Sequence, residues 1–134
     1  MSDAVIPPRV QRFIATHIDS IEKLEVLLLL RTQAGREWTA RDVSQELRIA
    51  ETSAAARLAD LAARRLVMER GGNPASYRYG PASPDDAQDV ADLQDTYATR
   101  RVSVISFIFS KPLDKVRGFA DAFRLKRDKD DGNG

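Results

Sequence analysis

The chain has 134 residues, of which 43% are hydrophobic and 31% are charged, and its formal net charge is +1. This length suits one domain with an appended arm, and it is enough to bury a core without cross-links. Because cysteine is absent, disulfides and thiol chemistry are excluded, and the single histidine, His17, leaves no histidine cluster for a metal ion.

The hydrophobic segments are short. The longest apolar runs, Val26–Leu30 and Val102–Phe109, are far shorter than a membrane span. The first ten residues lack the basic region and the long apolar stretch of a secretory signal. We therefore expect a cytoplasmic protein that has no membrane as a partner.

Charge is distributed unevenly. Residues 36–81 carry a net charge of +2, residues 82–99 carry −5, and residues 100–127 carry +6. A general attraction to nucleic acid is therefore absent, and any such binding depends on where individual cations lie. The aspartates of residues 82–99 lack the glycine-bearing loop of a calcium site and suit the start of a helix instead. No nucleophile–base pair or glycine-rich phosphate loop is visible, so we predict no enzymatic activity, no metal and no cofactor.

Helical patterns dominate the first third of the chain. Pro7-Pro8 suggests an extended arm, followed by a short helix in "RVQRFIATHI". The segment "DSIEKLEVLLLLRTQAG" predicts a strong helix, capped by Asp19 or Ser20 and ended by Gly35.

Two further helices and a hairpin follow. Thr39 is a good N-cap for "ARDVSQELRI", and Thr52 or Ser53 is expected to cap "SAAARLADLAARRL". In that second helix the leucines predict an inner stripe, whereas Arg57, Asp60 and Arg64 are expected on the outer face. The segments "LVMER" and "SYRYG" alternate like short strands on either side of the loop "GGNPA".

A helix, a short helix, a tight turn, a helix and a hairpin follow one another in the order of a winged helix-turn-helix. The segment "TARDVSQELRIAETSAAARLADLAARRLVMER" resembles the DNA-binding part of small bacterial winged-helix regulators such as the MarR family. Thr39 stands at the start of the support helix, and Leu58, Leu61 and Leu66 match the leucine spacing of the recognition helix. Where that family often has glycine before the "LV" pair, this chain has Arg65. The resemblance covers roughly residues 20–81.

The resemblance implies that the second helix, about residues 52–66, enters the major groove of double-stranded DNA, while the wing, about residues 67–80, contacts the backbone or the minor groove. Arg57 is the leading candidate, because a guanidinium can bond bidentately to guanine or phosphate. The predicted DNA-binding residues are Arg41, Thr52, Ser53, Ala56, Arg57, Arg70 and Arg78.

A second interpretation stays open for the same segment. "SAAA" offers few side chains that could bond to base edges, so the helix could read DNA through shape and phosphates, or could dock on protein. The alternative function is therefore a winged-helix module that binds another regulatory protein without significant DNA binding.

The segment "RRVSVISFIF", residues 100–109, is best interpreted as helix. As a strand, each face would carry three apolar residues and one serine, without amphipathic alternation. As a helix, Thr99, Ser103, Ser106 and Ser110 share one narrow stripe that continues the polar line from Pro84. We predict one long helix from Pro84 to Lys111, followed by a short amphipathic helix in "PLDKVRGFADAFRL".

The arm formed by these two helices is predicted to join two copies of the chain, because a helix that is apolar on most sides must be covered. The alternative is that its apolar residues complete the core of their own chain. The predicted interface residues are Leu93, Tyr97, Val104, Ile105, Phe107, Ile108, Phe119 and Phe123.

The predicted fold is thus mainly α with a small β-wing, and the predicted function is transcription regulation by a DNA-binding homodimer. The expected parts are an N-terminal arm with a short helix (1–18), a winged helix-turn-helix domain (19–82), a C-terminal helical dimerisation arm (83–127) and a disordered tail (128–134).

Overall fold

A computed structural model describes residues 6–110. This part of the chain is mainly helical and contains a small antiparallel sheet, as the sequence predicts at this coarse level. The third strand of that sheet, Trp38–Thr39, was not predicted. The elements in chain order are α1 (Pro8–His17), α2 (Ile21–Thr32), β1 (Trp38–Thr39), α3 (Ala40–Leu47), α4 (Glu51–Ala63), β2 (Val67–Arg70), β3 (Ser76–Tyr79), α5 (Pro84–Thr99) and α6 (Arg101–Phe109).

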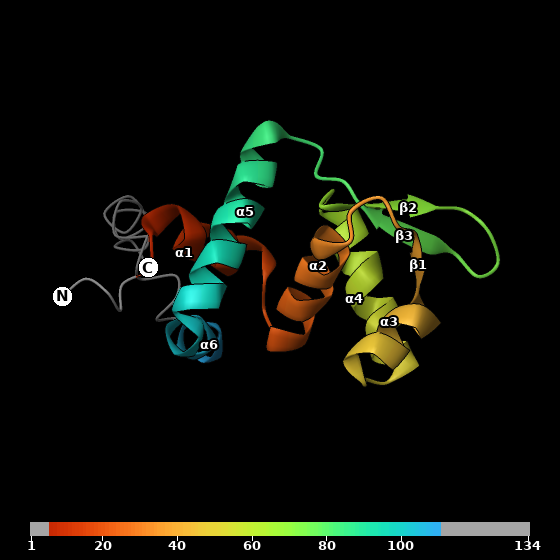
Figure 1. Cartoon of the computed structure of the whole chain (residues 1–134), viewed down its shortest axis with the longest axis horizontal. Helices are drawn as coiled ribbons and strands as arrows, with labels where there is room; N and C mark the ends of the chain where they lie inside the picture. Colours follow the sequence, from red (N-terminus) through yellow and green to blue (C-terminus); the bar gives the residue numbers. More distant parts are fainter. Residues whose placement is uncertain (1–5, 111–134) are drawn as a thin grey trace, which may run out of the picture.

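The elements form two groups that meet along α2 (Figure 1). In one group, α1 packs against α5 and α6. In the other, α4 packs on α2, α3 and β2, and the sheet lies at the far end. A single buried cluster runs through both groups, from Val10 and Ile14 through Leu27 and Leu58 to Val104. The described chain therefore folds around one core.

The sheet has the strand order β1–β3–β2. Cross-strand partners point to the same side of a sheet, and Trp38, opposite Tyr77, is fully buried. The face with Trp38 and Tyr77 therefore covers the helices. The pairs Met68↔Arg78 and Arg70↔Ser76 lie on the opposite, outer face. The predicted hairpin is present with its loop at residues 71–75.

Two of the three predicted helix caps are confirmed. The Ser20 hydroxyl accepts the amide of Lys23, and Thr39 forms a capping box with Asp42. The prediction for α4 is wrong, since Ala50 has the extended backbone of an N-cap and the helix has no side-chain cap. Thr52 and Ser53 consequently lie inside the first turn.

The end of α4 also differs from the prediction. The helix ends at Ala63 rather than near residue 66, and Arg64 is its C-cap. Arg65 then adopts a left-handed backbone with φ of 62°. Glycine adopts this conformation most easily, and it is common directly after a helix. Arg65 therefore has the backbone conformation that is typical of glycine at this position, with a charged side chain in addition.

The stretch 101–109 is helical, as predicted, but the prediction of one continuous helix from Pro84 to Lys111 is wrong. Arg100 leaves the helical region with φ −133° and ψ 51°, and it separates α5 from α6. In Figure 1, the axis of α5 lies roughly in the plane of the picture, whereas α6 is seen nearly end-on. The turn directs Val104 and Ile108 into the core, where they are 0% and 4% exposed.

This packing changes the prediction for the dimer interface. Leu93, Tyr97, Val104 and Ile108 are buried in the core of their own chain, which is the alternative named above. Ile105 and Phe107 are partly buried against the same core. Phe119 and Phe123 lie outside the described residues, as do the predicted short amphipathic helix and the tail 128–134. Among residues 6–110, no helix is both long and apolar enough to cross a membrane.

Candidate nucleic-acid interface

Helix α4 has a buried side and an exposed side opposite to it. Ala54, Leu58 and Leu61 form its buried stripe. At 100° per residue, the side opposite the core carries Thr52, Ala56, Ala59 and Ala63, all of which are exposed. We call these four residues the outer stripe. It offers one hydroxyl and four methyl groups to anything that approaches the helix.

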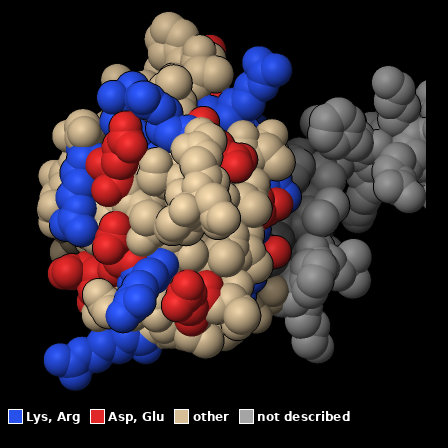
Figure 2. All heavy atoms as spheres, turned by 90° about the vertical axis from the view of Figure 1, so that its right-hand side faces the viewer, with Lys and Arg blue, Asp and Glu red and all other residues tan. Residues whose placement is uncertain are grey.

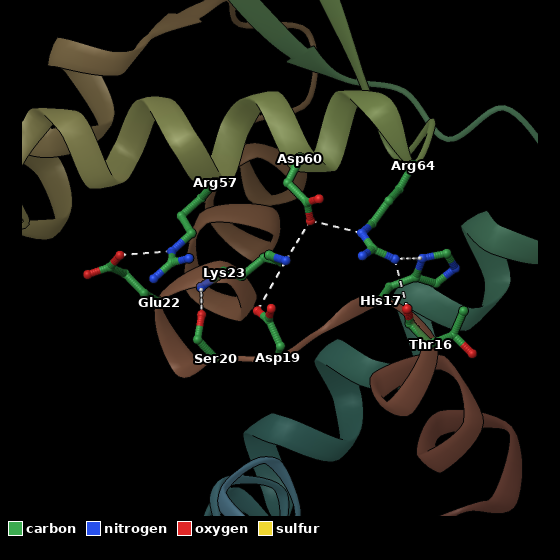
Figure 3. Close-up of polar contacts among 9 residues, drawn as sticks. All are labelled: Thr16, His17, Asp19, Ser20, Glu22, Lys23, Arg57, Asp60 and Arg64. Carbon is green, nitrogen blue, oxygen red and sulfur yellow. Dashed lines mark hydrogen bonds and ion pairs between the residues drawn. The ribbon is translucent and has the colours of Figure 1, made fainter. Parts of the chain in front are cut away.

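Arg57 does not lie on the outer stripe. Its Nε donates to Oε1 of Glu22 on α2 at 3.0 Å, and its side chain is 32% exposed. Figure 3 shows Arg57, Asp60 and Arg64 pointing from α4 toward α2 and the end of α1. The prediction that these three residues form the outer face is therefore wrong. Ion pairs with α2 hold Arg57 and Asp60, and Arg64 bonds to Asp60 and to the carbonyl oxygen of Thr16 on α1.

The central group of this side is a buried ammonium. Lys23 of α2 is 3% exposed, and its Nζ lies 2.5 Å from Oδ2 of Asp60 and 3.1 Å from Oδ1 of Asp19. The same Asp60 oxygen accepts from Nε of Arg64 at 2.8 Å. Burial by itself raises the pKa of Asp60, but hydrogen bonds and charge from Lys23 and Arg64 outweigh it, and the pKa lies below its usual value. Asp60 thus stays ionised and joins α4 to α2.

A cavity of about 390 Å³ separates the start of α4 from the hairpin. Its walls are mostly apolar, and Arg41 and Glu51 are its charged groups. Burial raises the pKa of Tyr77 in the wall, and the charge of Glu69 adds to the effect, so the phenol stays neutral at physiological pH. The lining residues are Thr39, Ala40, Arg41, Glu51, Ala55, Pro74, Ala75 and Tyr77.

The predicted DNA-binding residues fall into three places. Arg41 is exposed and lines the cavity, Thr52 and Ala56 are exposed on the outer stripe, and Ser53 is half-buried. Arg70 and Arg78 lie on the outer face of the sheet, and Arg70 pairs with Glu37 at 3.4 Å. Arg57 faces α2. The structure therefore places Thr52 and Ala56 on one exposed side of α4, and Arg41 at the cavity that the first turns of α4 also line.

Two further exposed arginines, which were not predicted to bind DNA, flank α4. Arg48 lies in the turn between α3 and α4 with φ of 59°, and Arg65 follows α4 with φ of 62°. No hydrogen bond or ion pair joins either side chain to another of residues 6–110. Each of these arginines directly follows a helix or its C-cap and has a left-handed backbone. In the sequence, only their position at the predicted end of a helix could have drawn attention to them.

Cations and carboxylates are mixed on this side of the molecule. Figure 2, which views the end with the hairpin and α3, shows basic and acidic side chains around an uncharged central area. Glu37, Glu51 and Glu69 accompany Arg41 and Arg70 here. The potential over the surface is therefore uneven rather than strongly positive.

In comparisons with known proteins, the chain matches no family model, no curated protein and no solved structure.

Proposed function

We propose that the segment from α2 to β3 is a winged helix-turn-helix and that it binds double-stranded DNA as part of a transcription regulator. The observation that carries this proposal is the exposed outer stripe of α4, a helix that follows α3 after a short turn and is followed at once by a hairpin. Arg41 of α3 and the start of α4 line the same cavity. A helix enters the major groove only when one side is free along several turns. Thr52, Ala56, Ala59 and Ala63 supply that side.

The chemistry of the outer stripe suits close approach more than base readout. Alanine methyl groups can contact the methyl group of thymine, and Thr52 can bond to a base edge. Affinity then depends on phosphate contacts and on the shape of the duplex. Arg41, at the start of α3, and Arg70, at the end of β2 beside the hairpin loop, are the main phosphate ligands in this proposal.

The salt dependence of the DNA-binding constant tests this proposal. We expect the wild type to bind a mixed-sequence duplex of about 30 base pairs, with an affinity that falls steeply as salt rises. Each phosphate contact contributes about 0.9 to the slope of the logarithm of the binding constant against the logarithm of salt. Arg41→Ala should therefore reduce that slope by about 1.

Arg57→Ala is the matched control, because Arg57 lies outside the outer stripe and is paired with Glu22 of α2. It should leave the slope unchanged. Arg78→Ala, on the outer face of the sheet, shows whether that face takes part. Negligible binding of the wild type at low salt would contradict the proposal, as would an unchanged slope for Arg41→Ala.

We also propose that the regulator is a homodimer whose contact is the outward side of α6. Val102 and Phe109 are 76% and 74% exposed, and Ile105 lies between them on the same side of the helix. Large apolar residues grouped in this way mark interaction surfaces, and two-fold symmetry would place two α4 helices on two half-sites.

The molar mass from light scattering tests this contact. We expect the wild type to have the mass of a dimer, and Val102→Asp combined with Phe109→Asp to have the mass of a monomer with an unchanged circular dichroism spectrum. Both positions are exposed, so the change does not disturb the core. Gln45→Asp on α3 is the control and should remain dimeric. A monomeric wild type, or a double variant with the mass of a dimer, would show that α6 is not the contact.

The second candidate function is docking on another regulatory protein without DNA binding. The specific observation in its favour is the composition of the outer stripe, three alanines and one threonine, within a surface of mixed charge. Binding that shows little dependence on salt, or no binding to any duplex, would favour this second function.

A further inference from the structure

Arg64 connects the end of α4 to the end of α1. Its Nε donates to Oδ2 of Asp60 on its own helix. Its Nη1 donates to the carbonyl oxygen of Thr16 at 2.8 Å and lies 3.4 Å from Nδ1 of His17. Figure 3 shows both contacts from the same guanidinium nitrogen. The two residues on α1 and the arginine on α4 are 47 or 48 positions apart in the chain.

The contact requires a neutral imidazole. A guanidinium can only donate hydrogen bonds, so Nδ1 of His17 must accept and cannot carry a proton. The ring of His17 also lies on Phe13, with 4.8 Å between the ring centroids. Apolar contact on one side and a cation on another both favour the neutral form.

Charged groups from three helices face His17. Arg64 and Asp60 come from α4, and Asp86 and Asp89 come from α5. Arg9 and Arg12 of α1 line the same cavity of about 140 Å³, and Arg9 pairs with Asp89 at 2.7 Å. The aspartates favour a protonated ring, while burial and Arg64 oppose it. Burial, followed by the charge of Arg64, prevails and lowers the pKa of His17 from its ordinary value of 6.5.

We propose that the contact between His17 and Arg64 is a pH-sensitive clasp between α1 and α4, closed when the imidazole is neutral and open when it is protonated. Protonation removes the acceptor at Nδ1 and places a second cation beside Nη1 of Arg64. Since that nitrogen also donates to Thr16, its displacement breaks both contacts with α1. Arg64 keeps Asp60, its partner on α4.

The direction of the effect follows from linkage. The unfolded chain binds a proton at His17 more readily than the folded chain, so stability rises with pH across this range. The contribution of the clasp is complete above the unfolded pKa of about 6.5, and it is lost as pH falls through the lower folded value. The inference does not depend on DNA binding.

The amino-acid composition allows the titration of His17 to be followed without interference from other side chains. The chain has one histidine and no cysteine, so His17 is its only side chain whose unperturbed pKa lies near neutrality. The imidazole proton signals in a nuclear magnetic resonance titration of the full chain therefore belong to this residue. We expect a pKa below 6.5 in the wild type and a higher one in Arg64→Gln, where the neighbouring cation is removed.

Thermal unfolding between about pH 5.5 and pH 8 provides the second readout. The midpoint of the wild type should fall toward the acidic end, and that of His17→Gln should stay level. Glu22→Gln, which breaks the Arg57 pair on the same side of α4, is the control and should keep the pH dependence of the wild type.

Three results would overturn the clasp. They are a wild-type midpoint that does not change with pH in this window, a His17→Gln protein that keeps the wild-type dependence, and an Arg64→Gln protein whose histidine pKa equals that of the wild type.

Discussion

Asp60→Ala is expected to lower the free energy of unfolding by about 2 kcal/mol. The substitution leaves the ammonium of Lys23, whose side chain is 4% exposed, with Asp19 as its remaining carboxylate. Loss of one partner of a fully buried ion pair costs about 3–5 kcal/mol. The smaller value applies because the Asp60 side chain is 37% exposed and water screens part of the charge.

Lys23→Met is the matched control for this prediction. It removes the buried charge together with its desolvation cost, and it fills a similar volume, so we expect a change within about 1 kcal/mol. Urea unfolding followed by circular dichroism measures both variants. If Lys23→Met destabilised the protein as much as Asp60→Ala, the ion pair itself, rather than an uncompensated charge, would be the source of the effect.

Ala56→Glu is expected to weaken DNA binding at least tenfold, or by about 1.4 kcal/mol, without loss of the fold. Ala56 is exposed at the middle of the outer stripe, and glutamate is a good helix former, so α4 should remain intact. The longer side chain would prevent close approach to the groove, and its carboxylate would be repelled by phosphate.

Two variants separate these causes. Ala56→Gln adds nearly the same volume without the charge and should have an intermediate affinity. Ala98→Glu makes the same change at an exposed alanine of α5, in the other group of helices, and should bind like the wild type at matched salt. Wild-type affinity for Ala56→Glu would mean that α4 does not enter the groove.

Local patterns predicted the elements of this fold well. Thr39 identified the start of α3, and the pair Asp19 or Ser20 identified that of α2, because a cap is a contact between near neighbours in the chain. The hairpin was predictable for the same reason, since its alternating residues flank a loop of glycine, asparagine and proline.

The direction in which α4 faces could not be predicted in this way. Arg57 is 35 residues from Glu22, and nothing in "SAAARLADLAARRL" shows that its charged side meets a charged side of α2. A polar face of a helix normally suggests solvent. Here Lys23 is buried on α2, and the charged side of α4 compensates it, whereas the alanine side is left exposed.

The break at Arg100 was hidden for a related reason. The polar and apolar lines of α5 and α6 continue through Arg100 with helical spacing, and neither glycine nor proline interrupts them. The turn arises from tertiary packing, because Val104 and Ile108 must meet a core that also contains α1 and α2. Arg101 further ties α6 to α2 through Glu25, at 3.5 Å.

The outer stripe of α4 should tolerate substitutions better than the rest of the helix. The residues that pack α4 against the core lie on its other sides. The exposed side chains of Thr52, Ala56, Ala59 and Ala63 therefore contribute little to the free energy of folding. Exchanging alanine for arginine, glutamine or lysine on an exposed helix costs only a few tenths of a kcal/mol in propensity. In the DNA complex that we propose, single substitutions at these positions would alter the target preference without loss of the fold. The outer stripe is therefore a suitable place for laboratory selection of altered specificity.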